Sequence, residues 1–397
     1  MATTITWSAP GLIDQRLPFA VPEGITDLSC PSIRLCVGTQ ASGVEISRHP
    51  LGGARAWAIT ALRVTLGVPL GPISCASPRL CVAVNDQGQL FTSTNPTRGP
   101  GAWRGSKVST LSQASAVSCP RVRFCIALEG RNVVVSTKPT RPSSWQVINV
   151  SSAGTFSSVA CPSSRLCVGT MYGAGYGGIT WTTSPTGPGW RWKFIYSNYD
   201  FGDRSIACPS TRLCVAIDGS GDVFTSTDPA RGRWKIGHLG GSKFRYGIYP
   251  FFVSCPSVHL CLSVGPSTVA VSTRPAGGAR TWRTTRQPAS NPGIGVPTCA
   301  SAHLCLATNG DLVFATANPA RGATAWSSSY LDQGYNPLTA IACPSDQLCV
   351  GIDGGGNLVT SSAPSATATA WNVAPLAIGP QTDNPPTVRL TCPSASC

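Results

Sequence analysis

Residues 213–229 read LCVAIDGSGDVFTSTDP, and the same pattern stands at 80–96 as LCVAVNDQGQLFTSTNP and at 348–364 as LCVGIDGGGNLVTSSAP. Each stretch has an apolar run, a turn of Gly, Asn and Asp, and a second apolar run that ends in Ser or Thr and Pro. Short apolar runs separated by such turn residues are typical of neighbouring antiparallel strands. The pattern therefore predicts a β-hairpin that recurs along the chain.

The cysteines show how regularly this unit recurs. The 18 Cys residues form nine pairs, eight with five residues between the cysteines and a last one with four. The first cysteines of successive pairs lie 42 to 49 residues apart, and in each complete unit a Pro is followed five to seven residues later by a Trp. A fixed period of this length indicates a repeat architecture.

Each unit reads as four short strands, a to d. Strand a leads into the first Cys, strand b starts at the second Cys, strand c precedes the Pro and strand d begins at the Trp. Strand b is apolar nearly throughout, which indicates burial on both faces. Four strands in about 45 residues are typical of one blade of a β-propeller. A Trp at one strand position of every blade is expected in the core between blades.

The number of units predicts an all-β fold, a β-propeller of eight four-stranded blades. We expect one propeller domain over residues 1–397, with complete units over about 25–375. Trp7 adds a lone strand d before them, and residues 385–397 add a strand a and part of a hairpin after them. A ninth blade closed from the two termini is the alternative.

Two c–d segments resemble a known propeller turn. STDPARGRW (226–234) and STNPTRGPGAW (93–103) are similar to degenerate forms of the Asp-box, or BNR, turn of sialidase-type propellers. Ser226, Asp228, Gly232 and Trp234 match that turn by residue type, although the spacing from Asp to Gly is longer. The CPSxxLCV repeat also resembles secreted β-propeller proteins of actinobacteria. The resemblance covers about residues 25–397 and implies the fold, whereas the Gly-His and Trp-Asp signatures of WD40 repeats are missing.

The paired cysteines are expected to form disulfides within their own units. Two cysteines that flank a five-residue turn can face each other across a hairpin at disulfide distance. Zinc sites usually have two to four residues between paired cysteines, so the spacing disfavours a metal. The predicted bridges are Cys30–Cys36, Cys75–Cys81, Cys119–Cys125, Cys161–Cys167, Cys208–Cys214, Cys255–Cys261, Cys299–Cys305, Cys343–Cys349 and Cys392–Cys397.

Disulfides imply an oxidising compartment, so we expect an extracellular or cell-surface protein. The first residues, MATTITWSAP, lack the charged and apolar regions of a signal peptide, so such a peptide is expected upstream or already removed. No run of eighteen apolar residues predicts a transmembrane helix.

Composition narrows the function further. Charged residues are only 12% of the 397, hydrophobic residues are 42%, and Gly and Pro number 42 and 34. Such a chain is neither mainly helical nor disordered. The net charge of +14 favours an anionic partner. Basic residues stand singly rather than in blocks of five or more, so nucleic-acid binding is not expected.

Two sets of residues are candidates for binding. The residue two before the second Cys of each unit is basic in seven of eight units, and in a propeller these residues form a ring on one face. The ring is an anion-binding candidate, although solvated turn residues are the simpler interpretation. It comprises Arg34, Arg79, Arg123, Arg165, Arg212, His259 and His303.

The second set lies in the longest d–a loops, on the face opposite that ring. Flat aromatic rings and planar polar groups suit the recognition of sugars, and exposed loops carry function disproportionately. The alternative is a set of unconstrained surface loops. The candidates are Tyr196, Tyr199, Asp200, Phe244, Arg245, Tyr246, Tyr335 and Asn336.

Catalysis is not indicated. The resemblance to sialidases implies an Arg triad, a Tyr nucleophile with a Glu partner and an acidic Asp, and the three Glu residues, Glu23, Glu45 and Glu129, do not fit those roles. Glycosidases generally need two positioned carboxylates, and no pair stands out. We predict no catalytic residues, no metal site and no cofactor. The favoured hypothesis is a secreted, non-catalytic propeller that binds a glycan or protein through its d–a loops. A sialidase-like glycoside hydrolase and a structural module of a larger secreted protein are the alternatives.

Overall fold

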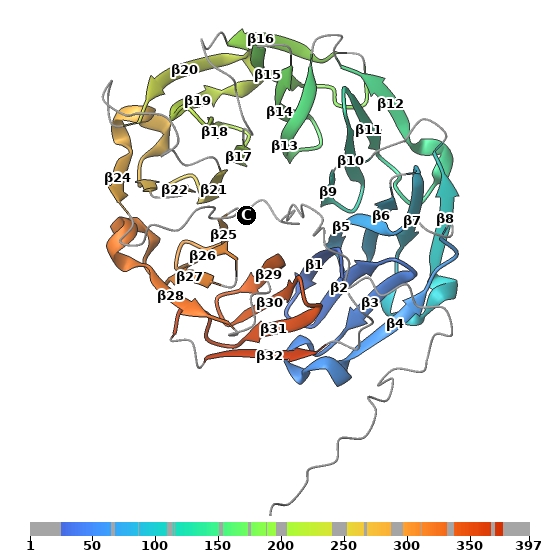
Figure 1. Ribbon diagram of the computed structural model, residues 1–397. Coiled ribbons are helices and arrows are strands. Elements are labelled where there is room, and N and C mark those ends of the chain that lie inside the picture. Colours follow the sequence, from blue (N-terminus) through green and yellow to red (C-terminus); the bar gives the residue numbers. More distant parts are fainter. Residues whose placement is uncertain are drawn as a thin grey trace, which may run out of the picture.

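The computed structural model describes residues 25–64, 68–85, 87–108, 114, 116–150, 154–173, 176–187, 189–195, 205–239, 252–265, 268–286, 297–310, 312–331, 337–366 and 370–375. These residues form eight four-stranded antiparallel sheets, each built from four consecutive strands. The sheets stand side by side in a ring around a central axis (Figure 1). The fold is therefore an eight-bladed β-propeller, as the repeats predict.

Strands a and b are the inner half of each blade (Figure 1). Strands a are β1 (Asp27–Ser32), β5 (Leu70–Ser77), β9 (Ala116–Arg121), β13 (Thr155–Ser163), β17 (Ser205–Ser210), β21 (Phe252–Ser257), β25 (Thr298–Ser301) and β29 (Leu338–Ser345). Strands b are β2 (Leu35–Gln40), β6 (Leu80–Asn85), β10 (Phe124–Glu129), β14 (Leu166–Gly173), β18 (Leu213–Ile217), β22 (Leu260–Val264), β26 (Leu304–Asn309) and β30 (Leu348–Asp353).

Strands c and d form the outer half. Strands c are β3 (Gly43–Ser47), β7 (Gln89–Ser93), β11 (Asn132–Ser136), β15 (Tyr176–Thr182), β19 (Asp222–Asp228), β23 (Thr268–Ser272), β27 (Leu312–Thr316) and β31 (Asn357–Ser361). Strands d are β4 (Trp57–Ala61), β8 (Trp103–Lys107), β12 (Gln146–Asn149), β16 (Arg191–Ile195), β20 (Arg233–His238), β24 (Arg283–Arg286), β28 (Ser327–Tyr330) and β32 (Trp371–Pro375).

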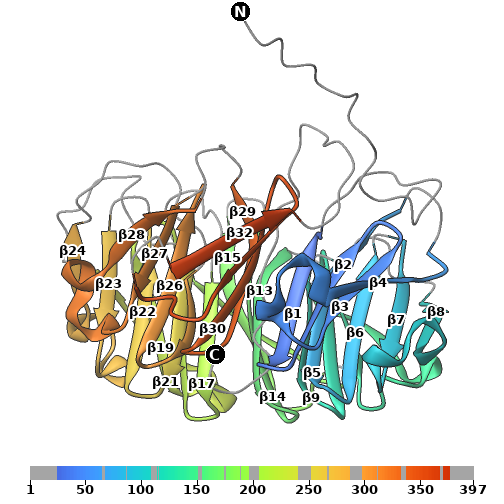
Figure 2. The same ribbon diagram turned by 90° about the horizontal axis from the view of Figure 1, so that it is seen from below.

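Most c–d connections contain short 3-10 helices, which Figure 2 shows toward the lower side of the ring. They are η1 (Pro50–Gly52), η2 (Ala54–Ala56), η3 (Pro96–Arg98), η4 (Pro100–Ala102), η5 (Pro142–Ser144), η6 (Pro229–Arg231), η7 (Pro275–Gly277), η8 (Ala279–Thr281) and η9 (Pro319–Ala325). A Pro begins most of them because its fixed φ suits the first position of a helical turn. None of the helices in the described ranges is long and apolar enough to cross a membrane.

The a–b hairpin is tighter than the sequence predicts. Strand a continues two residues beyond the first Cys, and Ser32 pairs with Leu35 across a turn of only two residues. The pairing register shifts between Ser29 and Ser32, at the Cys-Pro step. Every blade has a register shift at this place, including blades 2 and 7, where Ala76 and Ala300 follow the Cys, so the bulge belongs to the repeat and does not require a Pro. The predicted five-residue turn was wrong because it ignored this bulge.

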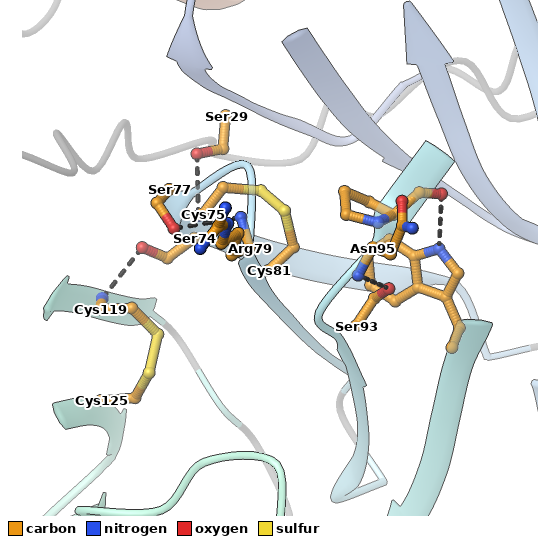
Figure 3. The surroundings of a disulfide bond; sticks show 12 residues. Ser29, Ser74, Cys75, Ser77, Arg79, Cys81, Ser93, Asn95, Cys119 and Cys125 are labelled. Carbon is orange, nitrogen blue, oxygen red and sulfur yellow. Dashed lines mark hydrogen bonds between the residues drawn. A yellow bond between two sulfur atoms is a disulfide. The ribbon is translucent and has the colours of Figure 1, made fainter. Parts of the chain in front are cut away.

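Disulfides close all eight described hairpins. The bridges from Cys30–Cys36 to Cys343–Cys349 are present, each within its own blade. The Cα atoms of the paired cysteines lie 3.9 to 4.1 Å apart. The predicted Cys392–Cys397 bridge lies outside the described residues. Figure 3 shows the bridges of blades 2 and 3.

Buried hydroxyl groups at the ends of strands c and half-buried ones in the a–b turns fix the turns at this end of the blades. A Ser or Thr at or near the end of strand c accepts the N–H of the residue two positions later in all eight blades, at 3.0 to 3.3 Å. Ser93 and Asn95 are an example (Figure 3). The Ser of the a–b turn accepts an equivalent bond in seven blades, at 2.8 to 3.3 Å. Such local side-chain bonds favour turns over further strand, which explains the Ser/Thr positions of the repeat.

The Trp column builds the core between blades, as predicted. Trp234 is buried among residues of the preceding blade, including Leu166 and Val168, and the other units repeat this arrangement. In the fourth unit Trp190 is the buried member of the column. The ring closes in the same way, because Trp57 of blade 1 packs against Val350 and Leu358 of blade 8. The described part of the chain has no strand shared between blades 1 and 8.

The inner strands of blades 1 to 3 are also joined by hydrogen bonds. Ser29 accepts the N–H of Cys75 at 3.0 Å, and Ser74 accepts that of Cys119 at 2.9 Å (Figure 3). The carboxylate of Asp27, which is buried, accepts the N–H groups of Leu28 and Ile73, both at 2.8 Å. Burial raises the pKa of Asp27 to about 7, against the lowering effect of these two N–H groups.

Candidate functional site

The topology divides the connections between two faces. Successive strands of a blade run in opposite directions, so the a–b turns and c–d connections share one face, which we call the basic face. The b–c turns and d–a connections share the other, which we call the loop face. The two faces are the ends of the ring seen edge-on in Figure 2.

The predicted basic ring lies on the basic face. Its seven members occupy equivalent a–b turn positions and are all exposed. The N–H of Arg79 donates to Ser77 at 3.1 Å, and six of the seven members are held in this way (Figure 3). The exception is Arg123, because Arg121 replaces the turn Ser in blade 3. Blades 1 to 5 carry Arg at this position, so the guanidinium groups form an uninterrupted arc.

The c–d connections add a second set of cations that the sequence analysis missed. All are exposed, and they lie farther from the axis than the a–b turns because strands c and d form the outer half of each blade (Figure 1). Their positions could have been found by counting from the Pro of each repeat. The set comprises Arg48, Arg55, Arg98, Lys138, Arg141, Arg231, Arg274, Arg280 and Arg321.

Few carboxylates offset these charges. Along the sequence, the a–b turns contain one acidic residue, Asp346, and the c–d connections contain one, Asp228. Asp228 Oδ2 lies 3.9 Å from Arg231 Nη1 and 4.0 Å from Arg233 Nε. Both arginines of these ion pairs are exposed, and Asp228 is half-buried. Among the described residues, these are the ion pairs that involve cations of the basic face. The face therefore carries a large positive charge.

Exposed aliphatic side chains stand among the cations. Ile33, Val122 and Val258 are 55%, 49% and 38% exposed and directly precede members of the basic ring in blades 1, 3 and 6. Leu51 of η1 is 49% exposed on the same face. The basic face is thus cationic and aliphatic.

The loop face differs in chemistry. Exposed Tyr172 lies near the end of strand b in blade 4, and exposed Tyr330 ends strand d of blade 7. His238 Nδ1 lies 2.9 Å from Asp222 Oδ1 where strands c and d of blade 5 reach this face. All eight predicted loop residues, Tyr196 to Asn336, lie outside the described residues.

Polar side chains fix several b–c turns of the loop face. Asp218 Oδ1 accepts the N–H groups of Ser220 and Asp222, at 3.0 and 2.9 Å. Asn85 and Asp353 accept N–H groups in the equivalent turns of blades 2 and 8. These described polar side chains therefore stabilise the b–c turns.

The described Glu residues lie within strands and not in the exposed turns. Glu45 is buried in strand c of blade 1, and Glu129 is buried at the end of strand b of blade 3. Asp27 lies between blades 1 and 2. Glu23 lies outside the described residues. Within the described ranges, no group of three or more His, Cys, Asp or Glu side chains is placed to hold a metal ion.

Comparisons with known proteins give the fold but no family. No protein-family model matches the chain, and no curated protein matches its sequence. Similar solved structures include the C-terminal WD40 domain of Sif2, at 8% identity and a TM-score of 0.60, covering 84% of this chain and 93% of that one.

Two further similar structures hold peptides. Sqt1 of Chaetomium thermophilum, bound to the N-terminus of a ribosomal protein, has 9% identity and a TM-score of 0.63, covering 86% of this chain and 97% of that one. YCF48, bound to a peptide, has 11% identity and a TM-score of 0.53, covering 89% and 99%. At these identities the likeness is one of fold alone, and it identifies a β-propeller repeat protein.

Proposed function

We propose that the chain is a single-domain, secreted or cell-surface propeller that binds a glycan or protein on its loop face without catalysis. The observation that carries the proposal is the pair of exposed tyrosines, Tyr172 and Tyr330, at the rim of a face whose b–c turns are fixed by buried polar side chains. A Tyr offers a flat apolar ring and a hydroxyl, which suits both sugar rings and peptide side chains. The long d–a loops, with the candidates from Tyr196 to Asn336, would supply the rest of the site.

Two further features support this proposal. The eight disulfides suit an oxidising compartment, which supports secretion. The similar propellers that hold a ribosomal protein N-terminus and a peptide give precedents for ligand binding by this fold. In the Asp-box-like turn, Ser226 has a structural role: its Oγ accepts the Asp228 N–H at 3.2 Å and donates to the Arg233 carbonyl at 2.6 Å.

A glycan array, a peptide library and a panel of fluorogenic glycosides test the function together. The expected result is binding on the array or in the library, no turnover of any glycoside, and weaker binding by Tyr172→Ala or Tyr330→Ala. Stacking on each ring contributes about 1 kcal/mol, so each change should weaken binding about fivefold. Arg104→Ala, on strand d of blade 2, is the matched surface control and should bind normally. Turnover of a glycoside would refute the non-catalytic assignment, and unchanged binding by both tyrosine variants would refute this face.

A further inference from the structure

The charges of the basic face are spread over its whole area. Cations occupy the inner ring of a–b turns and the outer ring of c–d connections, and together they reach blades 1 to 7. A linear polyanion or a peptide needs only one track of cations. Because the cations of the basic face lie in two concentric rings, they suit a partner with a broad, negatively charged surface.

The exposed aliphatic residues specify the partner further. Ile33, Val122 and Val258 occupy the same turn position in blades that are not neighbours, so one narrow ligand does not contact all three. Each directly precedes a member of the basic ring. Sugar recognition relies on flat aromatic rings, and the exposed tyrosines of the described residues lie at the other face. Aliphatic side chains beside Arg suit the boundary between lipid headgroups and acyl chains.

From these two observations we propose that the basic face docks on a membrane whose lipids carry anionic headgroups. The guanidinium groups contact headgroup phosphates, and the aliphatic tips enter the interface between them. The loop face then points away from the membrane. Docking of this kind needs no membrane-spanning helix, and it is independent of what the loop face binds.

Vesicle sedimentation with the full chain tests the proposal. The probes are vesicles of phosphatidylcholine alone and of phosphatidylcholine with 30% phosphatidylglycerol, at 0.1 and 0.5 M NaCl. We expect binding to the anionic vesicles at 0.1 M salt, at least about tenfold weaker binding at 0.5 M salt, and no binding to neutral vesicles. Equal binding to both kinds of vesicle, or binding to neither, would overturn the proposal.

Two sets of substitutions separate the contributions of charge and apolar contact. Replacing Arg34, Arg79, Arg123, Arg165 and Arg212 by Gln should lower the partition coefficient at least about 100-fold. The control replaces four exposed cations by Gln, namely Arg63, Lys107 and Arg131 at the loop face and Lys235 within strand d of blade 5, and should lower it less than about fivefold. Equal losses in the two variants would show that net charge alone is responsible and would refute the assignment to this face.

The apolar variant distinguishes a membrane from a polyanion. Replacing Ile33, Val122 and Val258 by Ser should lower vesicle binding about tenfold or more while leaving retention on heparin and on polyglutamate beads unchanged. Two outcomes would contradict membrane docking and point to a soluble polyanion as the partner. One is unchanged vesicle binding by this variant, and the other is tight retention of the unmodified protein on either bead without binding to vesicles.

Arginine modification of the unmodified protein gives a readout that needs no variant. Phenylglyoxal labelling followed by mass spectrometry should show Arg34, Arg79 and Arg123 protected by anionic vesicles, while Arg63 and Arg131 at the loop face stay reactive. Equal protection of both groups, or protection of neither, would overturn the proposed orientation.

Discussion

Gly232 gives the sharpest test of how neighbouring blades fit together. It follows η6 in blade 5 with φ +63° and ψ 31°, in the left-handed region. A Cβ added there would lie 2.0 Å from Cζ2 of Trp181, which belongs to strand c of blade 4. Gly232→Ala therefore combines a backbone cost of about 1–2 kcal/mol with overpacking of about 1–3 kcal/mol. We expect it to lower the free energy of unfolding by about 2–5 kcal/mol.

A double-mutant cycle separates these two contributions. Trp181→Ala removes the ring that the new methyl group would meet, so Gly232→Ala in that background should cost only the backbone part, about 1–2 kcal/mol. Urea unfolding, followed by circular dichroism, is measured for the parent protein, the two single variants and the double variant. Their midpoints are compared once the slope of the free energy of unfolding against urea concentration is shown to be the same in all four. Gly130→Ala is a control, because Gly130 has φ +51° and no neighbour within 4 Å of an added Cβ. Equal costs of Gly232→Ala in both backgrounds would refute the close packing of Trp181 on this turn.

Three further predictions address the core, the hairpins and the inner strands. Trp234→Ala should lower stability by about 3–5 kcal/mol, because the ring is 8% exposed, and a loss under about 1 kcal/mol in urea unfolding would contradict its place in the core. Peptide mapping without reduction should find each described bridge within one repeat, and replacing Cys75 and Cys81 together by Ser should cost about 2 kcal/mol. Burial raises the pKa of Asp27 from 3.8 to about 7, so the folded protein holds this proton more tightly than the unfolded chain. The stability contributed by this proton is full below pH 4 and should fall by at most about 4 kcal/mol as the pH rises from 4 to 7, with no further change above 7. For the parent protein, the urea midpoint should fall as the pH rises from 4 to 7. In Asp27→Asn the midpoint should lose this dependence on pH.

The repeat allowed the fold to be predicted because its spacings reflect packing that recurs in every blade. The Trp of strand d, the buried Pro and the paired cysteines each occupy one environment repeated eight times, so their columns are visible in the sequence. The tight a–b turn was missed because it depends on a bulge just after the first Cys of each unit, where an extra residue shifts the pairing register. The bulge recurs in every blade, but the residue after the Cys is Pro in some units and Ala in others, so no single residue type marks it.

The candidate site was harder to predict for a related reason. The ring from Arg34 to His303 lies in one alignment column and was found. Four of the outer cations stand two residues after the Pro of their units, whereas others, such as Arg48 and Arg280, stand at other offsets, so the complete set is recognised only when the blades close into a ring. The buried Asp27 has no counterpart in the other repeats, and its bond to Ile73 depends on a contact between two blades.

The assignment of each sheet to one contiguous repeat has a consequence for how the chain folds. Strands that pair lie within about 45 residues of one another, so the contacts inside a blade are short in sequence. Local contacts of this kind form quickly, whereas the packing of blade 1 against blade 8 must wait for the end of the described chain. A blade that emerges during synthesis can pair its strands and oxidise its cysteines before the next blade arrives. Among the described residues, ring closure is then a late docking of blade 1 against blade 8, made through side-chain packing rather than through a shared strand.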